Sequence, residues 1–580
     1  MNRRITFIAA LVVATASPAV SGASVRTICP GYRIDSEHLI RLSSNEKKRV
    51  CGDSGADSWK EIPPFQAKHF LRVSLQQRGY SYPEFVEGDG VMTILPGPRA
   101  FVKRVEVEGD PPESLRIWRK RSVKGAVLSP ALLTTLEDWA KAELKHRGYA
   151  CPGVSTSADP DKGTVVLHVD PGDKLRIAEV TEDEVDGLRP GTLRRFDAFR
   201  KGDVYDSRNL AVTTERIESN GVLQSSHFQT ECAPEGAKLH QRNIPGPTRL
   251  FSIGFGANSE DYFVIKADWK QARLGKNASS FEISGWGSYR KQNITLQGLL
   301  FPLPKPSRWY LNPFLSNRRV NESRYNYFAV DEWAPPAVTW ESAGAHYRLA
   351  FGPKYNFTRT FSGARSGPTH FVSASVRFEA ISHDYEYRIA NRQSGYVFSA
   401  SADLNSDEVL SSVTAQNLAI AGQALWNVAG LDPPLFVVGL RGLAQTTITD
   451  TGSASFPRLP PQFLSYLGGS QDLRGFKRKE LPNASRGALT ALYAGLEVQL
   501  ANVLPLNIQP IVFVDVGAMG QDTLSLDRPA YWSPGFGVRW PSLIGIFRAT
   551  AAHGYLIRND DPANDRLSHW QYYISIGEEF

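Results

Sequence analysis

Residues 570–580 read Trp-Gln-Tyr-Tyr-Ile-Ser-Ile-Gly-Glu-Glu-Phe, and most of this segment alternates as a β-strand does. Every second residue is apolar, so an extended strand would carry four apolar side chains on one face: Trp570, Tyr572, Ile574 and Ile576. Glu578 interrupts the alternation before the aromatic residue Phe580. A strand with one such face needs an apolar environment on that side, either a protein core or a bilayer.

The same alternation recurs from Arg249 to Phe580, where turn residues are frequent and helix signals are scarce. Residues 250–257, 512–517 and 535–540 each place apolar side chains on one face and glycine or a charged side chain on the other. At roughly twenty residues per strand and connection, this length predicts about sixteen strands, in the even-numbered range of outer-membrane barrels. A soluble β-sandwich is the alternative, but the many aromatic residues on one face and the export signal favour a transmembrane antiparallel β-barrel.

The N-terminus carries that export signal. Arg3-Arg4 precedes a short apolar run, Ile5 to Ala14, and Ser21-Gly22-Ala23 has the small residues of a cleavage site. The run is too short to span a hydrocarbon core of about 30 Å. We therefore expect residues 1–23 to be a cleaved signal peptide and the mature chain to begin near Ser24.

Charge and hydropathy exclude some classes of protein. The net charge is +7, but basic and acidic residues are interleaved and form no basic helix, which argues against nucleic acid as a partner. The mean hydropathy of −0.29 is compatible with a barrel, whose strands alternate lipid-facing and lumen-facing residues. The longest apolar stretch, Leu418 to Leu440, is broken by polar residues and prolines, so we expect no transmembrane helix.

The chain has four cysteines, Cys29, Cys51, Cys151 and Cys232, all before residue 250. An even number in an exported chain favours disulfides over metal ligands or catalytic thiols. Three pairings are possible. We favour Cys29 with Cys51, because that pair closes a short local loop, and this choice leaves Cys151 with Cys232 as the remainder.

The first half of the chain repeats a pattern of roughly seventy residues. Amphipathic helices end at Arg78-Gly79-Tyr80 and at Arg147-Gly148-Tyr149, and each is followed by strands and a Pro-Gly pair. A weaker third copy has a helix at Asp206–Ser219 that ends at Gly221-Val222. Glycine at that place ends a helix in the left-handed conformation, and the apolar residue after it packs back on the module. The predicted domains are three α/β modules, 24–98, 99–173 and 174–248, and the barrel, 249–580.

The most informative short stretch is Gly468-Gly469-Ser470-Gln471-Asp472-Leu473-Arg474-Gly475-Phe476. It resembles the Arg-Gly-aromatic tip of the sixth extracellular loop in the BamA/TamA superfamily of outer-membrane assembly and translocation proteins. Later stretches fit that family in order: 513–517, 535–540, 545–548 and 575–580. The upstream modules resemble POTRA domains, and three of them favour the TamA-like branch. The resemblance covers essentially the whole mature chain and implies POTRA repeats followed by a barrel of about sixteen strands.

In that family the loop folds back into the barrel, which implies that Arg474 enters the lumen. A guanidinium away from bulk water needs an anionic partner, and a carboxylate that accepts two hydrogen bonds matches it well. The alternation places the carboxylate of Asp515 inside the barrel. We therefore predict a loop lock in which Arg474 and Gly475 form the tip, Arg474 pairs with Asp515, Phe476 packs beside the pair and Arg539 lies nearby. The alternative is an ordinary exposed loop arginine.

The resemblance also implies a lateral gate between the first barrel strand, 250–257, and the last, 570–580. Glycine weakens strand packing, so the predicted gate residues are Gly254, Gly256, Ser575, Gly577 and Phe580. The implied location is the bacterial outer membrane, with the modules in the periplasm. The implied partners are unfolded outer-membrane or autotransporter client proteins, the lipid bilayer and an inner-membrane-anchored partner of the TamB type, without cofactor, nucleotide or nucleic acid.

Two other classes of function compete with this prediction. A two-partner-secretion transporter or a passive channel would share the barrel, but the first predicts an N-terminal plug helix and a proline-rich linker, and a simple porin leaves the modules unexplained. An enzyme is the other class, because Gly52-Asp53-Ser54-Gly55 matches a serine-protease nucleophile string. Only His38 precedes it in the mature chain, too close to build that fold, so we predict a loop without catalysis.

Overall fold

The computed structural model describes most of the predicted mature chain. The described residues are 24–53, 61–112, 115, 123–303, 307–363, 365–387, 392–449, 459–483, 486–542, 545–558, 562–567 and 569–577. The predicted signal peptide and Phe580 lie outside them. Among the described residues, no helix is both long enough and apolar enough to cross a membrane. The chain divides into two compact units, Met1–Glu143 with Pro152–Pro171, and Leu144–Cys151 with Gly172–Phe580.

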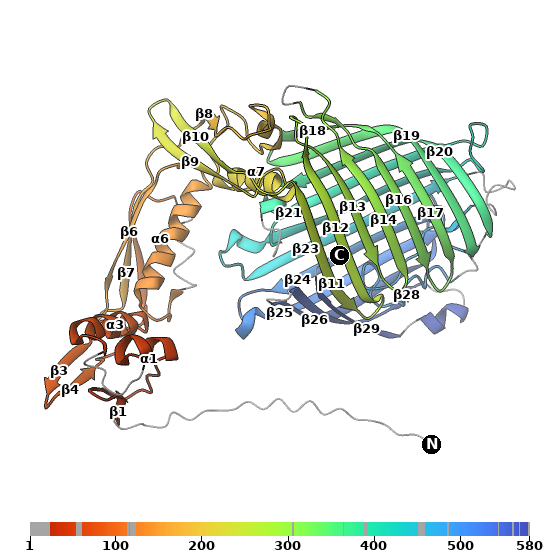
Figure 1. Ribbon diagram of the computed structural model, residues 1–580. Coiled ribbons are helices and arrows are strands. Elements are labelled where there is room, and N and C mark those ends of the chain that lie inside the picture. The colour runs from red at the N-terminus through yellow and green to blue at the C-terminus, as the bar shows by residue number, and fades with distance from the viewer. Residues whose placement is uncertain are drawn as a thin grey trace, which may run out of the picture. The chain divides into compact units, whose positions relative to one another are not determined.

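The first module contains a sheet in the order β1-β2-β4-β3, in which β2 and β4 are parallel and the other neighbours are antiparallel (Figure 1). Leu71 and Leu75 of one helix pack with Tyr32, Met92 and Ile94 of the sheet to form a buried core. The elements are β1 (Ser24–Cys29), β2 (Tyr32–Ser36), α1 (Ser44–Cys51), α3 (Pro64–Gln77), β3 (Glu84–Gly88) and β4 (Val91–Leu95).

The second and third modules repeat this arrangement. Their sheets have the orders β5-β7-β6 and β8-β10-β9, and in each the first strand is parallel to the last one along the chain. The second module consists of β5 (Arg104–Gly109), α6 (Pro130–Lys145), β6 (Gly153–Asp159) and β7 (Thr164–Asp170). The third consists of β8 (Ile177–Glu182), η1 (Thr192–Phe196), α7 (Ser207–Ser219), β9 (Ser225–Ala233) and β10 (Gly236–Ile244). The shared order makes the modules structural repeats, whereas their predicted boundaries remain predictions.

All three modules end their long helix with the same turn. Gly79, Gly148 and Gly221 have φ values of 89°, 105° and 68°, in the left-handed region that glycine adopts without strain. The residue after each glycine donates its backbone N–H to a carbonyl five residues earlier, at 3.0, 3.2 and 3.0 Å. This is the hydrogen bond of a Schellman motif, so the predicted role of these glycines is confirmed.

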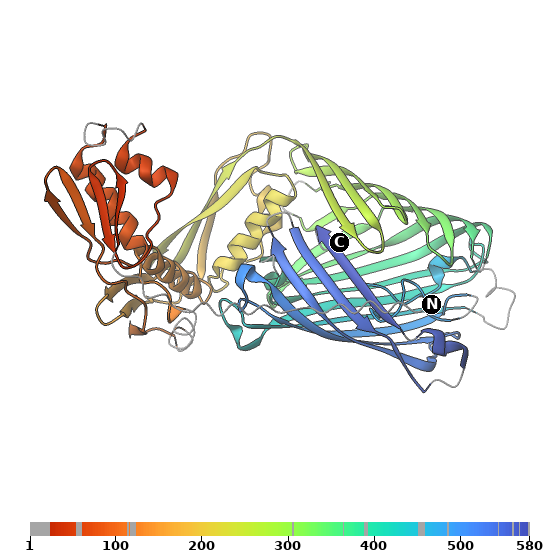
Figure 2. The ribbon, with the colours of Figure 1, turned by 90° about the horizontal axis from the view of Figure 1, so that it is seen from below.

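The rest of the second unit is a closed antiparallel barrel (Figures 1 and 2). Three of its strands are interrupted and appear as the segment pairs β15 with β16, β17 with β18, and β27 with β28, so sixteen strands close the barrel within the described part of the chain. The predicted fold class is therefore confirmed.

The segments of the barrel are β11 (Arg249–Asn258), β12 (Tyr262–Leu274), β13 (Ser279–Gly287), β14 (Lys291–Leu299), β15 (Trp309–Leu311), β16 (Phe314–Asn321), β17 (Asn326–Trp333), β18 (Pro336–Ser342), β19 (Ala345–Ser362), β20 (Gly367–Ser382), β21 (Gly395–Asn405), β22 (Gln416–Asn427), β23 (Phe436–Ile448), β24 (Thr490–Leu500), β25 (Gln509–Gly520), β26 (Asp527–Ser542), β27 (Gly545–His553), β28 (Tyr555–Ile557) and β29 (Trp570–Gly577). A short helix, α8 (His383–Tyr387), follows β20.

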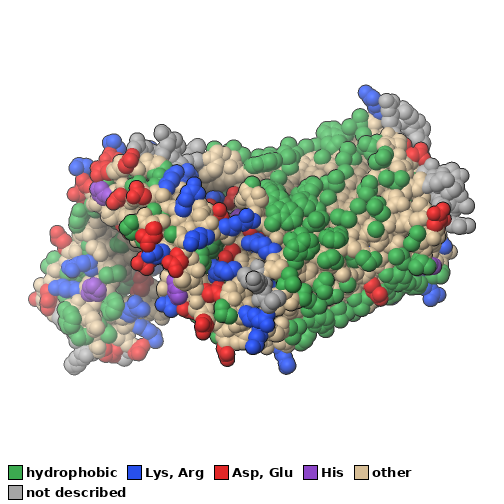
Figure 3. All heavy atoms as spheres, turned by 90° about the horizontal axis from the view of Figure 1, so that it is seen from above, with side chains coloured by type: hydrophobic (Ala, Val, Ile, Leu, Met, Phe, Trp, Pro, Cys, Tyr) green, Lys and Arg blue, Asp and Glu red, His purple; other side chains and the backbone are tan. Residues whose placement is uncertain are grey.

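The two faces of the barrel wall differ in polarity. Val512, Phe536 and Tyr572 point outward and are exposed, whereas Asp515 and Arg539 are buried on the lumen side. Apolar side chains cover the wall on the face shown in Figure 3. An apolar outer wall with polar groups inside is what a bilayer requires of a strand-built segment, so the barrel is a transmembrane one.

Candidate functional site

The candidate site is the segment Gly468–Glu480, which we call the inner loop. Leu467 and Leu481 pair through their backbones at its base, and Leu473 and Phe476 are completely buried in a cluster with residues of the barrel wall. An apolar loop tip packed against the inside of the wall has a fixed position. The geometry of its polar residues is therefore set by packing.

Arg474 lies at the centre of a buried ionic network. Its Nε and Nη2 donate to the two carboxylate oxygens of Asp515 at 2.8 and 2.9 Å, and its Nη1 donates to Glu497 at 2.7 Å. The side chain of Arg474 is 1% exposed. Burial of this cation is costly alone, but paired carboxylates with good geometry offset that cost.

Two neighbouring strands place these carboxylates. Glu497 is on β24 and Asp515 is on β25, where Glu497 faces Phe513 and Gly495 faces Asp515 across the ladder. The hydroxyl of Tyr493, also on β24, donates to Asp515 at 3.1 Å. Alternation alone puts these side chains on the lumen face. Asp515 was expected there from the sequence, whereas Glu497 and Tyr493 were not.

The last predicted member of the loop lock, Arg539, makes a different contact. Its Nη1 donates to Gln509 at 2.9 Å. The second cation on Glu497 is instead Arg548, whose Nη2 lies 2.5 Å from the same carboxylate oxygen. Arg539 and Arg548 face each other across β26 and β27, so the two arginines share one lumen face.

The tip of the inner loop also contacts the last strand. The backbone carbonyl of Phe476 accepts a hydrogen bond of 2.7 Å from the hydroxyl of Tyr573 on β29. The ring of Phe476 meets that of Tyr531 edge to face at 5.5 Å. A Cβ on Gly475 would lie 2.6 Å from the Cα of Gly554, so only glycine allows this close approach of two backbones. Tyr573 was not anticipated from the sequence.

The seam between the first and last barrel strands, β11 and β29, is short. Among the described residues, its ladder contains only the pairs Ala257 with Ile576 and Asn258 with Ser575. By comparison, β11 pairs with β12 through ten residue pairs and β29 pairs with β27 through eight. Fewer ladder pairs mean fewer backbone hydrogen bonds in the described part of this seam.

Glycines pack against each other beside this seam. Gly577 has a φ of 119°, and a Cβ on it would lie 3.0 Å from the Cα of Gly256 on β11. A Cβ on Gly545, at the start of β27, would lie 3.0 Å from the Cα of Gly577. The structure thus brings Gly256, Gly577 and Ser575 to the seam, whereas a Cβ on Gly254 would meet only Lys266 of β12, and Phe580 lies outside the described residues.

The third module is joined to the barrel by a second ionic network, centred on Glu341 of β18. Arg216 of α7 and Arg308 each lie within 3.1 Å of the Glu341 carboxylate, and His346 and His383 lie 2.6 and 2.8 Å from it. Arg216 also pairs with Glu386 of α8, at 2.5 Å. This network fixes α7 against the barrel, and nothing in the sequence pattern indicated it.

Both favoured disulfides are present. Cys29 is bonded to Cys51 and Cys151 to Cys232, and the described residues contain no free cysteine. The first bond ties β1 to the end of α1. The second ties the segment after α6 to β9, and Ala150 beside it packs in the core of the third module. The pairing chosen by loop length is therefore confirmed.

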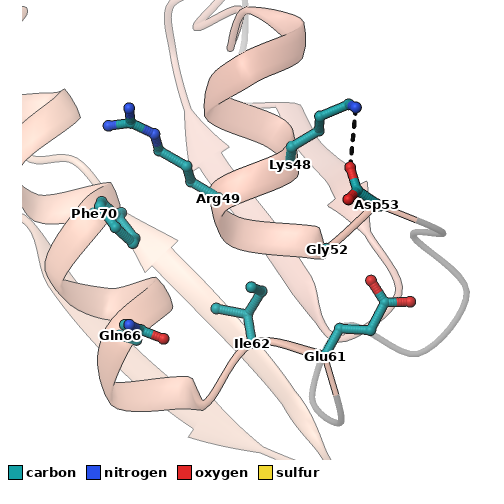
Figure 4. Close-up of a pocket in the computed structure, with 8 residues that line it drawn as sticks. All are labelled: Lys48, Arg49, Gly52, Asp53, Glu61, Ile62, Gln66 and Phe70. Carbon is teal, nitrogen blue, oxygen red and sulfur yellow. Dashed lines mark ion pairs between the residues drawn. The ribbon is translucent and has the colours of Figure 1, made fainter.

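The serine-protease-like string lies at the end of α1. Gly52 ends that helix, and Lys48 pairs with Asp53 at 2.9 Å on the rim of a pocket of about 410 Å³ (Figure 4). Ser54 and Gly55 lie outside the described residues. The pocket lining mixes basic, acidic and apolar side chains and shows no catalytic arrangement among the described residues. The whole described part of the chain contains no group of His, Cys, Asp or Glu side chains that could hold a metal ion.

Repeated α/β modules that lead into a sixteen-stranded barrel with an inward loop define the class of protein by its fold, and this is the architecture that the sequence resemblance implied. No family model matches the sequence.

Three solved structures illustrate the likeness in shape. BamA from Haemophilus ducreyi, lacking POTRA domains 1–3, is 15% identical with a TM-score of 0.48, over 82% of this chain and 99% of that one. CdiB from Acinetobacter baumannii is 14% identical with a TM-score of 0.45, over 83% and 90%. POTRA domains 3–5 of Haemophilus influenzae BamA are 17% identical with a TM-score of 0.26, over 31% and 80%. These values describe similarity of shape and carry no assignment of activity.

Proposed function

We propose that this chain is a TamA-like assembly and translocation factor of the bacterial outer membrane. The modules lie in the periplasm and bind client β-strands, and the barrel inserts clients into the bilayer, or passes them across it, through a lateral gate between β11 and β29. The clients are unfolded outer-membrane or autotransporter proteins. The proposal includes export by the signal peptide and an inner-membrane-anchored partner of the TamB type.

The observation that carries the proposal is the short seam between β11 and β29. Its two described residue pairs are the smallest ladder between neighbouring full-length strands among the described residues, and glycines flank it. A closed barrel is stable because every strand edge is hydrogen-bonded to a neighbour, so a ladder with few pairs lowers the stability of the wall at that seam. A gate for a polypeptide requires a seam that can separate, whereas a passive pore does not.

The modules supply edges at which an extended client could bind. In the described residues each three-stranded sheet ends in two edge strands, β5 and β6 in the second module and β8 and β9 in the third. Along β6, more and less exposed side chains alternate, as expected for a strand with one covered face. Addition of a client strand to such an edge uses main-chain hydrogen bonds and tolerates many client sequences.

A disulfide across the seam tests the gate. Asn258 and Ser575 face each other, and the backbone N–H of Ser259 donates to Ile574 at 2.9 Å. Since hydrogen-bonded and non-hydrogen-bonded pairs alternate along an antiparallel ladder, Asn258 and Ser575 form a non-hydrogen-bonded pair, in which side chains lie closer. Asn258→Cys with Ser575→Cys should therefore cross-link on oxidation and block insertion of a client barrel in vivo, and reduction should restore it.

The matched control joins two strands in a complete ladder. Ala419 and Gln445 face each other between β22 and β23, which share twelve residue pairs, so Ala419→Cys with Gln445→Cys should cross-link without loss of insertion. Efficient cross-linking of the seam with normal client insertion would contradict the gate. If such a cross-linked barrel also conducted ions steadily, the alternative of a two-partner-secretion transporter or a passive channel would replace the proposal.

A further inference from the structure

The inner loop has a second set of polar contacts, on the first hairpin of the barrel. Ser470 donates its backbone N–H to Glu260 Oε2 at 3.1 Å, and its hydroxyl contacts the same oxygen. Arg478 Nη1 lies 3.0 Å from Asp261 Oδ2. Glu260 and Asp261 form the turn between β11 and β12, so the loop is attached to the first strand's side of the seam.

The turn presents these carboxylates at a fixed place. The side-chain oxygen of Asn258 accepts hydrogen bonds from the backbone N–H groups of Glu260 and Asp261, at 2.9 and 2.6 Å. A Cβ on Gly469 would lie 2.7 Å from Glu260 Oε1, so glycine at this position lets the loop backbone reach the carboxylate. The turn and the loop thus each have a residue that makes this contact possible, Asn258 in the turn and Gly469 in the loop.

The same loop is attached to the other side of the seam. The carbonyl of Phe476 accepts the hydrogen bond from Tyr573 of β29, and Phe476 is six residues from Ser470 and two from Arg478. One short segment thus bridges the first and last strands from inside the barrel. The two strands cannot separate while both attachments remain.

We propose that Ser470 and Arg478 are positioning residues that make the inner loop a strap across the β11–β29 seam and hold the gate closed. This inference rests on the proposed gate function and assigns its regulation to residues outside the Arg474 network. Opening of the gate then requires release of Glu260 and Asp261 by the strap, while the loop stays on the C-terminal wall.

Burial decides which attachment is released. Arg474 is 1% exposed and is held by Glu497 and Asp515 on two adjacent strands of the C-terminal wall. Arg478 is 14% exposed, and besides Asp261 it has a bidentate partner, Glu322, between β16 and β17. Arg478 therefore keeps one carboxylate when it loses Asp261, whereas loss of Arg474 would take the cationic partner from the buried Asp515 and one of two cations from Glu497. Loss of the contacts on the β11 side is the less costly event.

The test measures the seam directly, in the purified full chain in lipid nanodiscs without client. Spin labels at Phe263 of β12 and Tyr572 of β29, both exposed on the outer face, report the distance across the seam. The native chain should give one short distance. Ser470→Ala with Arg478→Gln should raise the population of a longer distance about tenfold, the size of a typical coupling between sites. The conservative variant Ser470→Thr, which retains the hydroxyl and the native Arg478, should keep most of the native distribution.

Two controls separate opening of the gate from general loosening. Labels at Leu492 of β24 and Phe536 of β26 span the C-terminal wall and should not change in any variant. Lys354→Gln removes another lumen ion pair, with Asp403 at 2.9 Å, and should leave the seam distance unchanged. An unchanged seam distance in the Ser470→Ala, Arg478→Gln protein, or an equal change in both label pairs, would overturn the strap. Either result could occur while the seam disulfide still blocks client insertion, so failure of the strap is distinguishable from failure of the proposed function.

Discussion

The guanidinium carbon of Arg474 lies 3.3 Å from the centroid of the Phe513 ring, so the cation is stacked on an aromatic face while its edges meet two carboxylates. Phe513 and Asp515 are two residues apart on β25 and therefore share the lumen face. A planar guanidinium uses its face and its edges at once, which an ammonium cannot do.

Arg474→Lys should therefore behave as a loss of the network and not as a conservative change. Breaking a buried ion pair from one side costs about 3–5 kcal/mol, because the buried Asp515 loses the two hydrogen bonds of its guanidinium partner. The folded barrel should unfold at a lower temperature or denaturant concentration, as followed by circular dichroism. Lys354→Gln, which removes a less buried pair, should have a smaller effect. Equal stability of the native and Arg474→Lys barrels would show that the network does not hold the loop.

Gly577→Val should force the seam apart. Its φ of 119° strains a β-branched side chain, and the first added carbon would lie 3.0 Å from the Cα of Gly256 and 3.1 Å from the carbonyl oxygen of Phe255 on β11. The cross-link between cysteines at positions 258 and 575 should form several times more slowly in this variant. Gly254→Val is the matched control, since a Cβ there comes no closer than 3.9 Å to Lys266, and it should cross-link at the native rate.

The third module should lose stability as the pH rises from about 4 to about 7. Burial raises the pKa of Asp197 to about 7, and the nearby Arg194 only partly opposes this effect. The unfolded chain releases this proton near the ordinary value of 3.8, so between the two values the folded module holds more protons and its stability falls with increasing pH. Hydrogen exchange of the α7 amides, corrected for intrinsic rates, measures this slope. Asp197→Asn should flatten it, and an unaltered slope in that variant would assign the pH dependence to another group.

Removal of the disulfides should destabilise the modules to different extents. The bond between Cys29 and Cys51 spans 22 residues and that between Cys151 and Cys232 spans 81, so the chain-entropy model gives losses of about 3 and 4–5 kcal/mol. Urea unfolding of the two double Cys→Ser variants, followed by limited proteolysis of each module, checks both the size and the order. A larger loss for the shorter loop would argue against an entropic origin.

Local patterns were sufficient to predict the repeating parts of the fold. The helix-ending glycines and the alternating strands β25, β26 and β29 follow from short-range sequence rules. The alternation of side chains along β25 placed Asp515 in the lumen.

These local rules did not predict the contacts between residues far apart in the sequence. Arg478 sits in the run Lys477-Arg478-Lys479-Glu480, which looks like an exposed loop, and its partners Asp261 and Glu322 are 217 and 156 residues away. Arg539 and Arg548 face each other on adjacent strands, so side-chain alternation places both in the lumen. Alternation does not indicate which of the two reaches Glu497. Partner choice in the lumen depends on the register of many strands, which no single segment reveals.

The cluster around Glu341 makes the third module part of the barrel in a mechanical sense. Because the Glu341 carboxylate of β18 joins α7 to side chains from β19, α8 and the segment before β15, a pull on this module would be carried directly into the hairpin formed by β19 and β20, two long strands of the wall. A bound client that pulls on this module would then apply a torque to the barrel wall, because α7 is held by the Glu341 cluster and is not a flexible joint.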